Sequence, residues 1–225
     1  MANFLASIFG TEQDKVNCSF YYKIGACRHG DRCSRKHVKP SYSQTILLPS
    51  MYQNPAHDTK SHNRLTAEQC ANHFDAFYED LWCELCKYGE LEELVVCDNT
   101  NDHLIGNVYA RFKYEDSAQQ ACDELNSRWY AGRPIYCELS PVTDFREACC
   151  RLNSGEGCVR GGFCNFIHRK NPSPSSTPSS PSPPRSGSRC AAATTRAPRA
   201  APARSRRGGG SKGERTNEHR IVSRQ

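Results

Sequence analysis

The sequence predicts an α+β fold, with one sheet domain of β-α-β-β-α-β order between two small metal-binding modules and a basic tail at the end. Two observations predict this arrangement. Apolar residues in the middle of the chain recur at strand and helix spacings in that order of elements. The same spacing of three cysteines and one histidine occurs before and after this stretch. Hydrophobic residues make up only 37% of the 225 residues, so part of the chain lacks the material for a packed core.

The elements of the sheet domain follow from local patterns. Thr66 and Gln69 form a predicted capping box, which places the start of the first helix there. Apolar residues alternate along 107–114, which indicates a strand with Val108 and Phe112 on one face. The predicted strands are 44–48, 91–97, 107–114 and 134–139, and the predicted helices are 66–89 and 115–125. This order is typical of a ferredoxin-like sheet.

Charge is distributed unevenly along the chain. The net charge is +6, but residues 41–145 carry 7 basic and 17 acidic residues, or −10. The flanking modules are basic, with +6 at 15–40 and +3 at 146–170, and the tail at 171–225 carries +9. Nucleic acid is attracted to basic surface and repelled by acidic surface. We therefore expect RNA or DNA on the modules and a protein partner, of basic character, on the acidic middle.

The cysteines indicate metal binding. No apolar run reaches the ~18 residues of a membrane span, and the first ten residues lack the regions of a signal peptide. We therefore expect a soluble, intracellular protein. In a reducing compartment, 14 cysteines favour metal sites over a disulfide framework.

The repeated Cys and His residues predict two structural zinc ions. The predicted ligands are Cys18, Cys27, Cys33 and His37 in the first module and Cys149, Cys158, Cys164 and His168 in the second, both sets separated by 8, 5 and 3 residues. Three thiolates and one imidazole close a tetrahedral site, which leaves no position for a catalytic water. Each module is too small for a core of its own, so zinc is expected to supply its folding energy. Cys150 is an alternative ligand to Cys149, and the identical spacing favours Cys149.

Aromatic and basic side chains lie between the predicted ligands in both modules. Aromatic faces stack on unpaired bases and arginines hold phosphates, so single-stranded RNA is the expected ligand. One or two aromatic residues in each module are instead expected to cover the zinc, because a mini-domain needs some apolar packing.

The sheet domain resembles an RNA-recognition motif that has lost its RNA-binding face. That family usually places stacking aromatic residues on its first and third strands. Here Leu47 and Asn107 stand at two of these positions, and only Tyr109 remains. Together with the local charge of −10, this makes RNA binding by the sheet itself unexpected.

The loop after the second predicted helix, Arg128-Trp129-Tyr130, resembles that of U2AF homology motifs, which are RNA-recognition folds that bind proteins. Such modules hold a tryptophan of a partner peptide between this loop and an acidic first helix. The resemblance implies that Arg128 and Tyr130 frame that tryptophan, while Trp129 points out into the partner. The acidic residues of the helix are Asp75, Glu79, Asp80 and Glu84. Two alternatives stay open: Trp129 covers the edge of the core, and the acidic face is merely solvated.

The order of zinc finger, U2AF homology motif and zinc finger resembles the small-subunit family of the U2 auxiliary factor over about residues 1–170, most specifically at 5–12, 14–20, 106–109 and 139–147. The resemblance implies a pre-mRNA splicing factor of the nucleus. Its two CCCH fingers would jointly bind the AG at the 3′ splice site, and its central domain would heterodimerise with the large subunit to help recruit the U2 snRNP.

The implied RNA-binding residues are Phe20, Arg28, Ser34 and Arg35 in the first finger and Arg146, Arg151 and Phe163 in the second. Ser34 is equally well explained as a filler in a tight zinc loop. The expected domains are an N-terminal arm with room for a short helix at 1–14, finger 1 at 15–40, the U2AF homology motif at 41–142, finger 2 at 143–170 and a disordered Pro/Ser/Arg/Gly-rich tail at 171–225.

Parts of the sequence are compatible with two other classes of function. A CCCH regulator of messenger stability that binds AU-rich RNA is the alternative, although such proteins usually place their fingers in tandem. Cys83 and Cys86 form a Cys-x-x-Cys motif that could suggest redox chemistry, but they lie within the predicted first helix. The sequence has no phosphate-binding glycine loop, triad spacing or open metal site, so no enzymatic activity is expected.

Overall fold

The computed structural model describes residues 16–57, 65–154 and 157–174. The chain divides into two units, residues 1–188 and 189–225, and every described residue belongs to the first. The predicted N-terminal arm lies outside the described residues, as does the predicted tail beyond residue 174. None of the described helices combines the length and hydrophobicity needed to cross a membrane.

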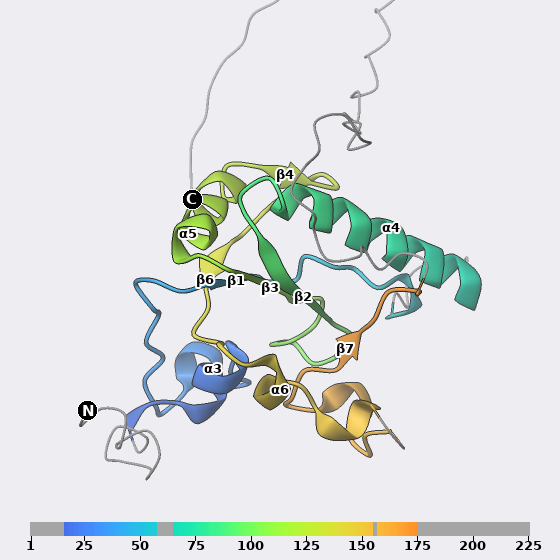
Figure 1. The fold of residues 1–225 in the computed structure, drawn as a ribbon. Coiled ribbons are helices and arrows are strands. Elements are labelled where there is room, and N and C mark those ends of the chain that lie inside the picture. Colours follow the sequence, from blue (N-terminus) through green and yellow to red (C-terminus); the bar gives the residue numbers. More distant parts are fainter. Residues whose placement is uncertain (1–15, 58–64, 155–156, 175–225) are drawn as a thin grey trace, which may run out of the picture. The chain divides into compact units, whose positions relative to one another are not determined.

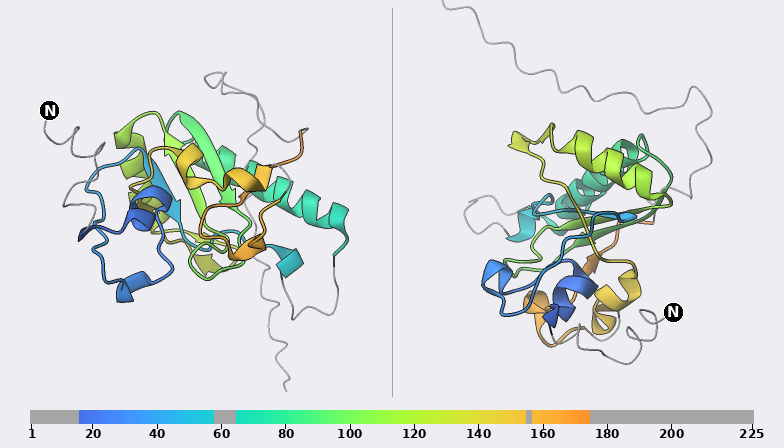
Figure 2. Two further views of the ribbon diagram at one scale, coloured as in Figure 1. Left: turned by 90° about the horizontal axis from the view of Figure 1, so that it is seen from below. Right: turned by 90° about the vertical axis from the view of Figure 1, so that its left-hand side faces the viewer.

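An antiparallel five-stranded sheet with the strand order β6-β1-β3-β2-β7 forms the centre of the described structure (Figure 1). Its strands are β1 (Thr45–Leu48), β2 (Leu91–Cys97), β3 (Val108–Phe112), β6 (Glu138–Leu139) and β7 (Arg169–Lys170). The long helices α4 (Ala67–Leu85) and α5 (Glu115–Leu125) lie on one face, and the short helices α3 (Ser19–Ile24) and α6 (Phe145–Ala148) lie on the other (Figures 1 and 2). The predicted ferredoxin-like α+β fold is confirmed.

The local predictions hold for the two long helices. The capping box of α4 is formed, because Thr66 Oγ1 accepts from the Gln69 backbone and the Gln69 side chain accepts from the Thr66 backbone. The α4 helix ends at Leu85, four residues before the expected Gly89. The apolar faces of α4 and α5 pack with alternate residues of the strands into the main core.

The predicted last strand, 134–139, is wrong in its extent. The structure divides it into β5 (Arg133–Pro134), which forms a hairpin with β4 (Trp129–Tyr130), and β6, which pairs with β1. The interruption has a local cause. The side chain of Asn126 both donates to the Cys137 carbonyl at 2.9 Å and accepts from the Cys137 N–H at 2.9 Å. An amide side chain therefore takes the place of a neighbouring strand.

Candidate nucleic-acid interface and metal centres

Each finger brings three cysteines and one histidine together around one point. The groups are Cys18, Cys27, Cys33 and His37 in finger 1 and Cys150, Cys158, Cys164 and His168 in finger 2, and the ligand atoms within each group lie within 4.8 Å of one another. In both, a buried histidine Nε2 has no hydrogen-bond partner among the described residues. An imidazole nitrogen left without a partner inside a thiol cluster fits a zinc ligand. Two structural zinc ions therefore fit this chain.

The second metal group corrects one predicted ligand, because it contains Cys150 and not Cys149. Cys149 has extended backbone angles, so its side chain and that of Cys150 point to opposite sides. The direction is set by pairing: Cys149 forms a parallel bridge with Ile167, and the Cys150 N–H donates to the Ile167 carbonyl at 2.8 Å. Cys149 then packs into the apolar cluster against the sheet. Burial raises the pKa of its thiol to about 11.

The aromatic residues of helix α3 in finger 1 lie in two different environments, one buried and two exposed. Tyr21 is buried and stacks on the ligand His37, with ring centroids 4.6 Å apart and an interplanar angle of 9°. Phe20 and Tyr22 precede and follow it on α3 and are 42% and 58% exposed. One aromatic residue therefore covers the metal, as expected, and its two neighbours face solvent.

The two fingers cover the face of the sheet that an RNA-recognition motif would use for RNA. Leu47, Val95 and Tyr109 on that face form a cluster with apolar residues of the fingers, and Tyr109 is fully buried. The contact is close: a Cβ at Gly25 of finger 1 would lie 2.9 Å from the Tyr109 ring. The surviving aromatic residue of the sheet is therefore a docking residue for the fingers, with no surface left for a base.

A loop of the central domain, residues 98–107 between β2 and β3, holds finger 2. Asn99 is 1% exposed, and its amide donates to the carbonyls of Cys164 and Phe166 at 3.1 and 3.0 Å. Its Oδ1 accepts from the His168 N–H at 2.8 Å. The Thr100 N–H donates to the Gly162 carbonyl at 2.9 Å. No local sequence pattern predicts this role of the loop, since a short polar run carries no signal of which backbone groups it will bond.

The fingers lie side by side. The rings of Phe20 in finger 1 and Phe166 in finger 2 are 6.4 Å apart in an edge-to-face arrangement. Lys23 and Glu147 form an ion pair at 3.7 Å between α3 and α6. The predicted RNA-binding residues Phe20, Arg28, Ser34, Arg35, Arg146, Arg151 and Phe163 are all exposed, Phe163 to 75%. The structure thus joins two exposed aromatic and basic surfaces that are far apart in sequence.

The predicted partner-binding residues gather around one end of α4, with one exception. Arg128 bonds to Glu84 and donates to the Tyr88 hydroxyl at 3.1 Å. Burial by itself raises the pKa of Glu84, but the hydrogen bonds from Arg128 and Lys87 outweigh it, and the pKa of this carboxyl is lowered. Asp75 lies nine residues earlier on the helix, where it accepts from the Ser173 N–H at 2.9 Å. That carboxylate therefore faces the segment that leaves finger 2.

The loop beside Glu84 is a tight hairpin that presents one large aromatic side chain. Ala131 and Gly132 both have positive φ, at 48° and 75°, as the two central residues of a type I′ turn require. Trp129 is 69% exposed, so it does not cover the core. Tyr130 packs edge-to-face against Phe77 of α4, with ring centroids 5.9 Å apart.

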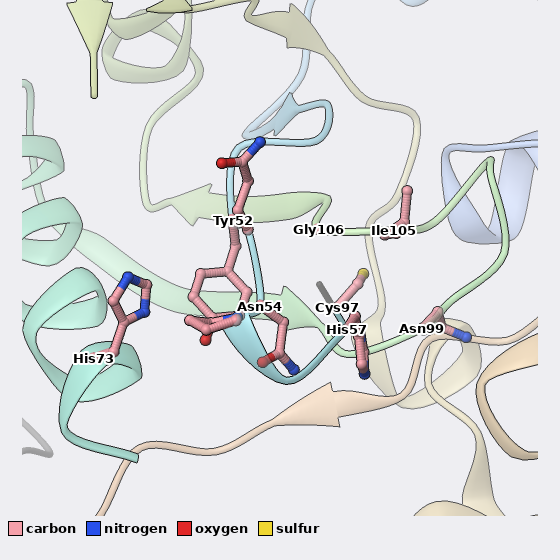
Figure 3. A pocket seen from close by; sticks show the side chains of 10 residues that line it. Tyr52, Asn54, His57, His73, Cys97, Asn99, Ile105 and Gly106 are labelled. Atoms are coloured by element: carbon pink, nitrogen blue, oxygen red, sulfur yellow. The ribbon is translucent and has the colours of Figure 1, made fainter. Parts of the chain in front are cut away.

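A hollow of about 470 Å³ lies beside β2, where the 52–57 segment and α4 meet it (Figure 3). Two of the amides that line it are hydrogen-bonded within the chain. Asn54 donates to Asp98 Oδ1 at 2.7 Å, and Asn99 bonds finger 2 as described above. The buried Tyr52 hydroxyl has no hydrogen-bond partner among the described residues, and burial raises its pKa.

Comparison with known proteins agrees with this geometry. Residues 13–39 match the family model "Zinc finger C-x8-C-x5-C-x3-H type (and similar)". The chain is 70% identical over 174 residues to the splicing factor U2AF 23 kDa subunit of Schizosaccharomyces pombe, which covers 77% of this chain and 80% of that protein. It belongs to the U2AF small-subunit family.

Two further comparisons complete this picture. The splicing factor U2af 38 kDa subunit of Drosophila melanogaster is 58% identical over 178 residues, covering 76% of this chain and 67% of that protein. The solved RRM of RNA15 aligns with 44% of this chain and 92% of its own at 18% identity and a TM-score of 0.29. The fold assignment of this chain rests on its own strand order and register. Its relatives are named as splicing factors, not as enzymes.

Proposed function

We propose that this chain is the small subunit of a nuclear heterodimer and that its two fingers jointly bind the AG of pre-mRNA at the 3′ splice site. The observation that carries the proposal is the contact of Phe20 with Phe166, which places two exposed, basic finger surfaces next to each other. Two weak sites on one rigid support bind one strand much more tightly than either alone. Because the fingers cover the sheet face that an RNA-recognition motif would use, RNA would bind to the fingers themselves.

The test uses the zinc-loaded full chain and short labelled RNAs that contain UUAG, UUCG or UUAC, titrated at fixed salt and read by anisotropy. We expect UUAG to bind at least tenfold more tightly than the others, and Arg35→Ala to weaken it by about 1–3 kcal/mol. Lys113→Ala, on an exposed lysine of the central domain paired with Glu90, is the control. Equal binding of the three RNAs would refute AG recognition, and tighter binding of an AU-rich RNA would favour the messenger-stability alternative.

We further propose that the hairpin at Trp129 and the nearby end of α4 bind a tryptophan-bearing peptide of the large subunit. Arg128, held by Glu84 and Tyr88, would present a flat guanidinium to the entering indole, and exposed Glu79 and Asp80 would meet basic residues of the peptide. What supports this is a 69% exposed tryptophan on a hairpin, since large exposed aromatic residues are common binding hot spots.

Trp129→Ala is expected to weaken binding of that peptide by about 2 kcal/mol, or roughly 30-fold, because a hot-spot side chain is lost. Calorimetric titration of the peptide into the full chain measures the change. Tyr114→Ala removes a 58% exposed aromatic residue next to α5 and is expected to leave the affinity unchanged. Equal loss in both variants would argue against a site at the hairpin.

A further inference from the structure

Finger 1 and the 98–107 loop of the central domain border a second, open hollow of about 620 Å³. The finger contributes residues 27–32, which include two arginines and one aspartate. The loop contributes Asp102 and His103. Arg28 is the one predicted RNA-binding residue that lines this hollow, so the RNA-binding surface of finger 1 continues onto the acidic central domain.

Charged side chains of both signs face this hollow but form no ion pairs with each other. Arg28, Asp31, Arg32 and Asp102 are all exposed, and none forms a side-chain hydrogen bond or an ion pair with another described residue. Arg28 and Asp102 nevertheless lie near enough to act electrostatically on His103. Donors and acceptors therefore converge on one space and are available to a ligand.

The presence of both positive and negative side chains favours a nucleobase over a phosphate group as the ligand. The two carboxylates offset the charge of the two arginines, so the hollow has no net electrostatic attraction for the phosphates of the RNA backbone. A nucleobase edge offers both donors and acceptors, and unpaired bases of single-stranded RNA are recognised through these edges. Guanine fits the set best. Its O6 and N7 accept from an arginine, and its N1–H and N2 amino group donate to a carboxylate.

We propose that this hollow binds the guanine of the AG dinucleotide, with Asp102 accepting from its N1–H and N2 amino group and an arginine of finger 1 donating to its O6 and N7. The proposal rests on the proposed function and extends it. The acidic domain then takes part in reading the base, where the fingers alone had been expected to do so.

Inosine in place of guanine tests the contact, because inosine lacks only the N2 amino group. The zinc-loaded full chain is titrated with an RNA that contains a single guanine, within UUAG, and with the same RNA carrying inosine there. A hydrogen bond to a charged group is worth about 1.5–3 kcal/mol, so guanine is expected to bind tenfold more tightly than inosine or better. Asp102→Asn should reduce this preference to threefold or less.

The matched control is Asp116→Asn, which removes the same charge from an exposed position on α5 and should keep the preference. Because either variant can raise affinity for all RNA, the ratio of guanine to inosine is the quantity compared. Unchanged preference in Asp102→Asn, or no preference in the unaltered chain, overturns the guanine site while AG selectivity stands. If the unaltered chain binds UUAG and UUCG equally well, the proposed function itself is refuted.

Discussion

Cys150→Ser is expected to leave one zinc ion per chain where the unaltered protein holds two. The Cys150 thiol belongs to the metal group of finger 2, and a serine hydroxyl is a poor zinc ligand. Structural zinc contributes roughly 10–16 kcal/mol of binding free energy in small fingers, and finger 2 has little core of its own to replace it. Zinc content by elemental mass spectrometry and thermal unfolding of the full chain measure the effect.

The matched variant is Cys149→Ser, which changes the adjacent cysteine. We expect it to retain two zinc ions, because that side chain packs toward the sheet and away from the metal group. Cys18→Ser provides the positive control, since it removes a ligand from finger 1 and should also leave one zinc ion. One zinc ion in Cys149→Ser and two in Cys150→Ser would show that the repeated 8, 5 and 3 spacing determines the ligand after all.

Asn99→Ala is expected to lower the free energy of unfolding by about 3 kcal/mol. It leaves the Phe166 carbonyl and the His168 N–H of finger 2 without their partner and removes one of the two hydrogen bonds to the Cys164 carbonyl. Denaturant titration of the zinc-loaded full chain measures the loss. Asn101→Ala is the control. Its side chain donates a single hydrogen bond, to the Cys164 carbonyl at 2.7 Å, and its loss should cost only about 1 kcal/mol.

The same substitution has a consequence for the proposed function. Asn99 does not contribute a zinc ligand, so both ions should remain bound in Asn99→Ala. Finger 2 would be held less firmly beside finger 1, and the advantage of joint binding would fall with its effective concentration. Affinity for the UUAG-containing RNA should then drop while zinc content stays at two. A variant as stable as Asn101→Ala would show that backbone contacts alone, such as Thr100 with Gly162, position the finger.

Local physics explains what the sequence by itself determined. The α5 helix spans the predicted residues, because its apolar stripe at helical spacing needs only one face of the sheet to pack against. The α4 capping box depends on two residues three positions apart. The ligands of finger 1 lie within 20 residues, so their spacing alone specified the group that the structure brings together. In each case the interacting groups are neighbours in the chain.

The tertiary structure decided what depends on direction and on distant partners. The repeated spacing favoured Cys149, but the metal group contains Cys150. Adjacent residues of extended chain face opposite sides, and only the pairing with Ile167 sets which of the two side chains faces the metal group. Tyr109 stands where an RNA-recognition motif stacks a base, and only the structure shows that two fingers from opposite ends of the domain bury it. Asn99 resembles any loop asparagine until finger 2, 65 residues later, supplies the carbonyls that its amide satisfies. These choices are made by hydrogen bonding and burial between remote segments, which local sequence patterns do not encode.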